Sequence, residues 1–304
     1  MPAPGSSPPP DHRSGFVAVV GRPNVGKSTL VNRLVGHKVA ITAPVPQTTR
    51  SRLAAILTLP HAQLVFVDTP GLHQPRHRLG QWMVETAVRA VADADAVAWV
   101  VDASEGVTAE DEEVAARLRA QAAPVVAVLN KVDRTDPAGL AAVQDRVAGL
   151  GTWTAVLPVS ALTGAGLDRL VETLVGLLPV GPPYYPPDMV TDQPEQFLAR
   201  ELIREAAIHL TREEIPHSIA VEIEEFAPRE GTDVVYIRAT LHVERESHKK
   251  ILIGRDGRML REVGRRARQE IEALLGRRVY LDLWVKTTPR WRDQDAVVRR
   301  LYPQ

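Results

Sequence analysis

Residues 21–28 constrain the fold of this chain more than any other segment, because their sequence, GRPNVGKS, matches the pattern GxxxxGK[ST]. An apolar run at residues 16–20 precedes the segment, and residues 29–35 follow it with the apolar spacing of a helix. In that context the glycines let backbone N–H groups turn inward as an anion nest, and the helix N-terminus adds partial positive charge. The segment therefore predicts a phosphate-binding loop. We expect Lys27 to reach the β- and γ-phosphates and the Ser28 hydroxyl to ligate Mg²⁺.

Two further motifs follow strand-like segments downstream of this loop. The sequence DTPG at residues 68–71 ends a β-type run, where Asp68 can hold Mg²⁺ through water and the Gly71 N–H can meet a γ-phosphate. The sequence NKVD at residues 130–133 ends another apolar run. The Asp133 carboxylate can accept two N–H bonds from the guanine N1/N2 edge, which adenine lacks, so this motif predicts selection of guanine. Asn130 is expected to bridge the base and the loops, the Lys131 stem to lie over the purine, and Ser160, Ala161 and Leu162 to close the site.

Strand-like and helix-like segments alternate through the first 178 residues, which is typical of a doubly wound, mostly parallel α/β sheet. We expect helices at residues 82–92, 109–123 and 167–178 and a buried strand at 96–102. The motifs then fall at the carboxyl ends of strands, where such sheets bind ligands. Four carboxylates start the 109–123 helix. They favour its macrodipole and are expected to be solvated rather than to bind a metal; they are Glu110, Asp111, Glu112 and Glu113.

Charge is distributed unevenly, although the 304-residue chain has 37 basic and 37 acidic residues in total. Residues 181–244 have 5 basic and 13 acidic residues, whereas residues 245–304 have 16 and 8. The basic end is a candidate polyanion-binding surface, while the neutral total argues against indiscriminate nucleic-acid binding. The absence of cysteine excludes disulfides and zinc-thiolate sites. No apolar run approaches the roughly 18 residues of a transmembrane helix, and the proline-rich start lacks the apolar region of a secretory signal.

The second half of the chain has a different pattern. Prolines make residues 180–192 a stiff, extended linker. Beyond it we expect an α-β-β-α-β-α order that begins with a helix at residues 195–210 and ends with one at 291–301. GRDG at residues 254–257 follows an apolar triplet and opens a basic helix at 258–275. This order matches a KH module, whose GxxG loop packs against a nucleic-acid backbone beside a groove for about four unpaired nucleotides. The expected organisation is a disordered tail at 1–14, a nucleotide-binding domain at 15–179, the linker at 180–192 and a smaller α+β, type II KH domain that binds RNA at 193–304.

Together these motifs resemble the Era family of bacterial GTPases, in which a Ras-like GTPase domain precedes a C-terminal KH domain. The family's GRPNVGKST stands at residues 21–29, PQTTR at 46–50, DTPG at 68–71 and NKVD at 130–133, and the linker, the GxxG loop and the LDLWVK strand at 281–286 also match. The resemblance implies a GTP-hydrolysing switch that binds the 3′ end of 16S ribosomal RNA and assists maturation of the 30S subunit. It also implies Mg²⁺ as cofactor and a cytoplasmic monomer, and some family members contact the inner membrane peripherally.

The motifs and the resemblance define the candidate site residues. Catalysis is expected to depend on Asn24, Lys27, Thr49 and Gly71, and Mg²⁺ on Ser28, Thr49 and, through water, Asp68. A mobile loop supplies the switch I residues Gln47, Thr48, Thr49 and Arg50; Thr49 fits the Mg²⁺ role better than Thr48, and the choice stays open. The expected GTP contacts are Gly21, Arg22, Pro23, Asn24, Val25, Gly26, Lys27, Ser28, Thr29, Asp68, Thr69, Pro70, Gly71, Asn130, Lys131, Asp133, Ser160, Ala161 and Leu162. The expected RNA contacts are Ile253, Gly254, Arg255, Gly257, Arg258, Arg261 and Arg265.

Three positions modify this interpretation. Many GTPases place a water-orienting Gln where this chain has Leu72, so slow intrinsic turnover is expected. Asn24 resembles GTPases that use a bound K⁺ in place of an arginine finger, which adds K⁺ as a candidate cofactor. Asp256 within the GxxG loop weakens attraction to a phosphate backbone, and arginines of the following helix are expected to compensate: Arg258, Arg261, Arg265 and Arg266.

Other interpretations remain open at the level of sequence. His61, His73 and His77 could form a metal site or supply a general base, although exposed loop histidines are the simpler explanation. The chain could be a nucleotide-regulated RNA-binding factor that acts outside ribosome assembly, an ATP-using nucleotide kinase, or an RNA scaffold with an inactive nucleotide domain. The NKVD motif argues against the kinase, and the intact phosphate loop argues against the scaffold.

Overall fold

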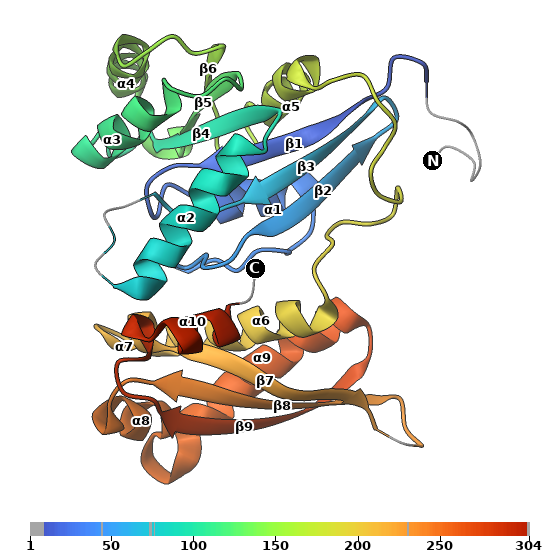
Figure 1. Ribbon diagram of the computed structural model, residues 1–304, viewed down its shortest axis with the longest axis vertical. Helices are drawn as coiled ribbons and strands as arrows, with labels where there is room; N and C mark the ends of the chain where they lie inside the picture. Colours follow the sequence, from blue (N-terminus) through green and yellow to red (C-terminus); the bar gives the residue numbers. More distant parts are fainter. Residues whose placement is uncertain (1–8, 44, 73–74, 76, 230, 303–304) are drawn as a thin grey trace. The chain divides into compact units, whose positions relative to one another are not determined.

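The computed structural model describes residues 9–43, 45–72, 75, 77–229 and 231–302. The chain forms two compact units (Figure 1). The first contains residues 1–40, 49–75 and 81–192, and the second contains residues 41–48, 76–80 and 193–304. The loop expected to act as switch I is therefore divided between the units, with the break between Thr48 and Thr49.

A six-stranded sheet in the order β2-β3-β1-β4-β5-β6 organises the described part of the first unit. Strand β2 is antiparallel to β3, and the other neighbours pair in parallel. The strands are rich in Val, Ala and Leu and are buried on both faces, as expected of a parallel sheet covered by helices. The bounds are β1 (Arg13–Val20), α1 (Lys27–Val35), β2 (Leu53–Leu59), β3 (Ala62–Asp68), α2 (Arg78–Ala92), β4 (Ala96–Asp102), α3 (Ala109–Leu118), β5 (Val125–Asn130), η1 (Val132–Arg134), α4 (Pro137–Gly149), β6 (Ala155–Pro158) and α5 (Leu167–Leu177).

The parallel strands carry the expected nucleotide motifs to one edge of the sheet. The phosphate loop follows β1, the DTPG segment begins at the last residue of β3, NKVD begins at the last residue of β5, and residues 160–162 follow β6. Because the carboxyl ends of parallel strands share an edge, four segments far apart in sequence meet there.

Both ends of the first unit differ in detail from the expectation. Strand β1 begins at Arg13, inside the stretch expected to be a tail, and Ser14 is fully buried. The proline-rich segment lies against the unit, because Gln63 on β3 holds it. Its Oε1 accepts the N–H groups of Tyr184 and Tyr185 at 2.7 and 2.9 Å, and its Nε2 donates to the Tyr185 carbonyl at 2.9 Å. The Tyr184 ring also stacks on Phe16, with centroids 5.4 Å apart.

The second unit is an α+β structure built on a three-stranded sheet in the order β7-β8-β9, in which β8 pairs antiparallel with β7 and parallel with β9. Helix α6 packs against β7 and helix α9 against β9 and α6, so that one face of the sheet closes the core (Figure 1). The fold class expected from the sequence is confirmed. The bounds are α6 (Glu195–Leu210), α7 (Ile215–Ser218), β7 (Ala220–Pro228), β8 (Val234–Val243), α8 (Glu246–Ile253), η2 (Arg255–Gly257), α9 (Arg258–Leu275), β9 (Arg278–Thr287), η3 (Trp291–Asp293) and α10 (Asp295–Leu301).

Candidate nucleotide and RNA sites

The phosphate loop closes tightly around its lysine. Gly26 has φ 95°, and a Cβ there would lie 2.5 Å from Asn130 Nδ2, so only glycine fits. Lys27 is buried, and its Nζ donates to the carbonyls of Gly21 at 3.1 Å and Arg22 at 2.9 Å. Burial lowers the pKa of Lys27 to about 8, against the attraction of Asp68. An ammonium that is poorly solvated by water gains much from the negative charge of a phosphate.

Three oxygen-bearing side chains converge beside this lysine. Ser28 Oγ donates to Asp68 Oδ2 at 2.8 Å and lies 2.9 Å from Thr49 Oγ1, which is 3.3 Å from the same carboxylate oxygen. The other oxygen, Asp68 Oδ1, is buried and has no hydrogen-bond partner among the described residues. Burial raises the pKa of this carboxyl, against the nearby Lys27 charge. Two hydroxyls and a buried, under-coordinated carboxylate are hard oxygen donors that fit Mg²⁺.

The geometry distinguishes between the two threonines of the switch loop. Thr48 Oγ1 donates to the Val45 carbonyl at 2.8 Å, within its own turn. Thr49 Oγ1 instead joins Ser28 and Asp68. The arrangement therefore favours Thr49 as the metal-binding threonine.

The NKVD segment joins the phosphate loop to the segment after β6. Asn130 Nδ2 donates to the Val25 carbonyl at 2.9 Å, and Asn130 Oδ1 accepts the Ala161 N–H at 3.0 Å. Ser160 Oγ donates to Asp133 Oδ1 at 2.5 Å, which fixes the carboxylate expected to bind guanine. Leu162 is mostly exposed. Asn130 thus links the two loops, while its expected contact with the base and the other GTP contacts stay predictions.

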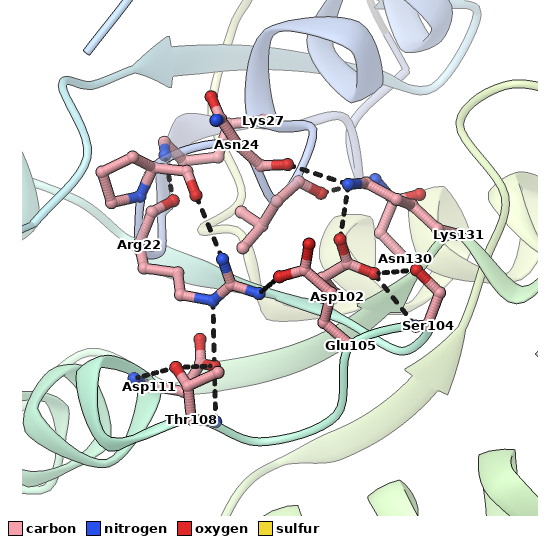
Figure 2. Close-up of polar contacts among 12 residues, drawn as sticks. Arg22, Asn24, Lys27, Asp102, Ser104, Glu105, Thr108, Asp111, Asn130 and Lys131 are labelled. Atoms are coloured by element: carbon pink, nitrogen blue, oxygen red, sulfur yellow. Dashed lines mark hydrogen bonds and ion pairs between the residues drawn. The ribbon is translucent and has the colours of Figure 1, made fainter. Parts of the chain in front are cut away.

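Two basic side chains behind the loop, Lys131 and Arg22, form ion pairs that were not expected from the motifs (Figure 2). Lys131 Nζ donates to Asp102 Oδ2 at 2.5 Å and to the Asn24 carbonyl at 2.9 Å. Burial alone would raise the pKa of Asp102, but hydrogen bonds from Lys131 and Ser104 lower it. Asp102 is the last residue of β4 and lies at the same sheet edge as the motifs. Its position at the end of an expected strand was the feature of the sequence that could have indicated its part in the site.

Arg22, one of the expected GTP contacts, forms ion pairs with two carboxylates. Arg22 Nε donates to Asp111 Oδ2 at 3.1 Å, and its Nη2 donates to Glu105 Oε2 at 2.5 Å (Figure 2). Burial opposes the charge on Arg22, but the two carboxylates outweigh it and raise its pKa. Asp111 is fully buried, so the expectation that the acidic residues of this helix are solvated is wrong for Asp111. It also forms a capping box with Thr108, and the pattern TxxD could have indicated this role.

The GxxG loop connects α8 to α9 in the second unit. Gly254 has φ 73°, and a Cβ there would lie 2.7 Å from the Met259 Cβ. Asp256 occupies the left-handed region with φ 54°, and its carboxylate lies 3.9 Å from Arg258 on the exposed surface. Arg265, expected to contact RNA, is paired at 2.8 Å with Glu262 of its own helix. The RNA contacts of this loop and helix therefore stay predictions, and the compensation expected from Arg265 is reduced by Glu262.

The remaining candidates have simple surroundings. Leu72 is buried, and its N–H donates to the Gly21 carbonyl at 3.2 Å. His73 lies outside the described residues, and His77 Nδ1 accepts the Gly80 N–H at 2.9 Å. No three His, Asp or Glu side chains of the described residues are grouped as a metal site. Among those residues, too, no helix combines the length and apolar character required to cross a bilayer.

Comparison with known proteins identifies both units. Residues 16–131 match the family model of 50S ribosome-binding GTPases, and residues 214–292 match the KH domain model. The fold is similar to that of Era in complex with MgGDPNP and nucleotides 1506–1542 of 16S ribosomal RNA, with 44% identity and a TM-score of 0.93 over 95% of this chain and 98% of that one. A point variant of Aquifex aeolicus Era bound to GDP·AlF4⁻ has 43% identity and a TM-score of 0.91, with the same coverage. The GTPase domain, the KH domain and these full-length matches show that the chain belongs to the Era family of GTPases.

Proposed function

We propose that this GTPase is a nucleotide-controlled factor that binds the 3′ end of 16S ribosomal RNA and assists maturation of the 30S subunit. The proposal rests on one observation. The side chains of Ser28, Thr49 and Asp68 lie together beside the phosphate loop, in a chain that also has a KH unit. A relative that is similar over nearly its whole length has been captured with both MgGDPNP and the 16S RNA fragment. A ribosomal partner supports the proposal that the protein acts in the cytoplasm. Contact with the inner membrane and the monomeric state stay predictions from the resemblance.

Different residues of the first unit have different roles in GTP hydrolysis. Lys27 and the loop N–H groups hold the β- and γ-phosphates, and Asp133 accepts from the guanine edge. Bound Mg²⁺ neutralises charge that develops on the phosphates, and Ser28, Thr49 and Asp68 are the residues that would hold it. Gly71 offers its N–H to the γ-phosphate. With the buried, apolar Leu72 at the next position, no side chain there orients the attacking water, so slow intrinsic turnover is expected.

We further propose that K⁺ assists the reaction at Asn24. Asn24 lies in the phosphate loop with φ 64°, and its backbone carbonyl accepts a hydrogen bond from Lys131 Nζ. A K⁺ ion held at Asn24 would offset negative charge on the phosphates, the role that an arginine finger has in other GTPases. GTP turnover should therefore be several-fold faster in KCl than in NaCl at equal ionic strength, and the Asn24→Ala variant should lose this difference. Equal rates of the unaltered protein in the two salts would refute the role of K⁺.

RNA binding is tested with the purified full-length protein and a fluorescent RNA that has the sequence of the 16S 3′ end. The protein should bind this RNA more tightly than a scrambled RNA of equal length, and Arg255→Ala with Arg258→Ala should weaken binding. Arg117→Ala is the matched control, because it removes an exposed arginine from α3 of the first unit. Equal affinity for the two RNAs would contradict the proposed function.

A further inference from the structure

The β8–β9 sheet of the second unit has a second face, opposite the core. Side chains alternate along both strands, so that Val235, Ile237 and Ala239 lie in the core and the residues between them point outward. In the parallel register Tyr236 lies opposite Tyr280 and Arg238 opposite Asp282, with Trp284 two residues further along β9. Helix α9 covers the other face (Figure 1). We call the outward-pointing set of Tyr236, Arg238, Tyr280, Asp282 and Trp284 the aromatic face.

Two rings of the aromatic face are largely exposed to solvent. Trp284 is 60% exposed and Tyr280 is 54% exposed. Tyr236 and Tyr280 stack with ring centroids 5.8 Å apart and planes at 17°. Large exposed rings gathered on one surface mark a binding site more often than they stabilise a fold.

One carboxylate holds these groups in place. Asp282 Oδ2 accepts from Trp284 Nε1 at 3.2 Å and from the Tyr236 hydroxyl at 3.3 Å, and it lies 3.6 Å from Arg238 Nε. The Arg238 guanidinium in turn lies 5.6 Å from the centroid of the Tyr236 ring. Side chains that are already ordered lose little conformational entropy when a ligand stacks on them.

The charge around the aromatic face favours a polyanion over a protein partner. Arg278 and Lys286 occupy outward positions of β9 on either side of the rings. The neighbouring carboxylates of β7 have partners within the unit. Glu222 pairs with His242 and Arg300, Glu224 accepts from Thr240, and Glu225 lies 3.9 Å from Arg238. Arg238 is thus shared between Asp282 and Glu225, and Arg278 and Lys286 are the two cations of the outward β8 and β9 positions that remain for a polyanion.

We propose that the aromatic face is a second RNA-binding surface, on which unpaired bases stack against Tyr280 and Trp284. Strand β9 is one of the two edge strands of the sheet, and its inner side packs against α8 and α9, the helices that flank the GxxG loop. An RNA strand that leaves the loop reaches the aromatic face by passing around this edge. Aromatic stacking with flanking cations binds single strands with little dependence on sequence. This inference rests on the proposed RNA binding. In it, the aromatic face adds affinity for a longer unpaired segment of RNA.

The test compares two single-stranded RNAs on the full-length protein with GDPNP. One RNA has about four nucleotides, enough to fill a KH groove, and the other extends it by six to eight unpaired nucleotides, a length chosen to pass the edge. Trp284→Ala and Tyr280→Ala should each weaken binding of the longer RNA about ten-fold and leave the short RNA unchanged. Trp284→Phe should retain most of the affinity, because it keeps a ring. The longer RNA should also quench tryptophan fluorescence, and this quenching should be lost in Trp284→Phe.

The controls separate this inference from the proposed function. Leu274→Ala removes an exposed apolar side chain from α9 and should bind both RNAs like the unaltered protein. If Trp284→Ala binds the longer RNA with full affinity, the face serves another partner, such as a protein, and the inference is wrong while the proposed function stands. If the unaltered protein binds neither these RNAs nor the 16S 3′-end RNA, the proposed function itself fails.

Discussion

Base selection at the scale of single residues depends on how Asp133 is held. Ser160 Oγ donates to Asp133 Oδ1, and Asn130 links the neighbouring Ala161 N–H to the Val25 carbonyl of the phosphate loop. The carboxylate is therefore oriented by the protein rather than by the ligand. A site with fixed hydrogen-bonding groups strongly rejects a ligand that cannot satisfy them.

Replacing Asp133 with Asn should transfer this preference from guanine to xanthine. The amide NH2 places a donor where the carboxylate has one of its two acceptors, so Asn cannot accept both N–H groups of the guanine N1/N2 edge, whereas it can donate to the C2 carbonyl of xanthine. We expect affinity for GTP to fall about 10- to 100-fold and affinity for XTP to rise, as measured by calorimetric titration. Asp145→Asn, at an exposed position of α4, should change neither affinity. Unchanged GTP binding by Asp133→Asn would show that another group selects the base.

Residues within contiguous motifs could be predicted from the sequence, whereas pairs formed by the fold could not. The spacing of GxxxxGKS, DTPG and NKVD brings Ser28, Asp68 and Asn130 to the correct edge, because each motif ends a strand. Arg22 and Asp111 are 89 residues apart, and each has an ordinary explanation by itself. Only the packing of α3 beside the phosphate loop shows that they pair.

At the scale of elements, the start of α3 serves two purposes. Thr108 accepts the Asp111 N–H, and the Asp111 carboxylate accepts the Thr108 N–H, which completes a capping box. The same carboxylate oxygen accepts from Arg22 of the phosphate loop. Asp111, in the first turn of helix α3, thus also holds Arg22, so that a change at this residue affects the phosphate loop.

Two substitutions distinguish these purposes. Thr108→Ala removes the cap and should lower the free energy of unfolding by about 1 kcal/mol with nucleotide affinity unchanged. Asp111→Ala also leaves the largely buried Arg22 without that partner, so it should cost about 3–5 kcal/mol and weaken GDP binding. Urea unfolding and fluorescent-GDP titration measure the two effects. Equal losses in both variants would mean that the Arg22 pair contributes nothing beyond the cap.

Elements with strong end signals or clear periodicity were predicted closely, and those without were missed or misplaced. Helices α6 and α9 have the expected bounds. Helix α8 was missed because its N-cap residue, Arg245, provides no side-chain cap, and because the apolar residues of this eight-residue helix lie at its end. The helix expected at 109–123 ends at Leu118. The helix expected at 291–301 divides into η3 and α10 at Gln294, which has extended backbone.

At the scale of the whole molecule, the switch loop belongs to both units. Residues 41–48 are part of the second unit, where Ile41 joins the core and Glu205 of α6 accepts the Thr42 N–H at 2.9 Å. Thr49, the next residue after that segment, belongs to the first unit and meets Ser28 and Asp68. A nucleotide that orders Thr49 therefore acts on a chain segment anchored in the RNA-binding unit. This connection is a covalent route through which we expect the bound nucleotide to change RNA affinity.

Weakening that anchor should separate nucleotide binding from RNA binding. In the unaltered protein, we expect affinity for the 16S 3′-end RNA to differ by about 5- to 150-fold between GDPNP and GDP, the usual range of coupling between two sites. Glu205→Ala removes the acceptor of the Thr42 N–H and should bring the two RNA affinities to within a few-fold, while the affinity for GDP without RNA stays the same. By linkage, the effect of RNA on GDPNP affinity must shrink by the same factor. Asp233→Ala, in the exposed turn between β7 and β8, should keep the full difference. A Glu205→Ala protein that folds and still shows the unaltered ratio would place the coupling elsewhere in the chain.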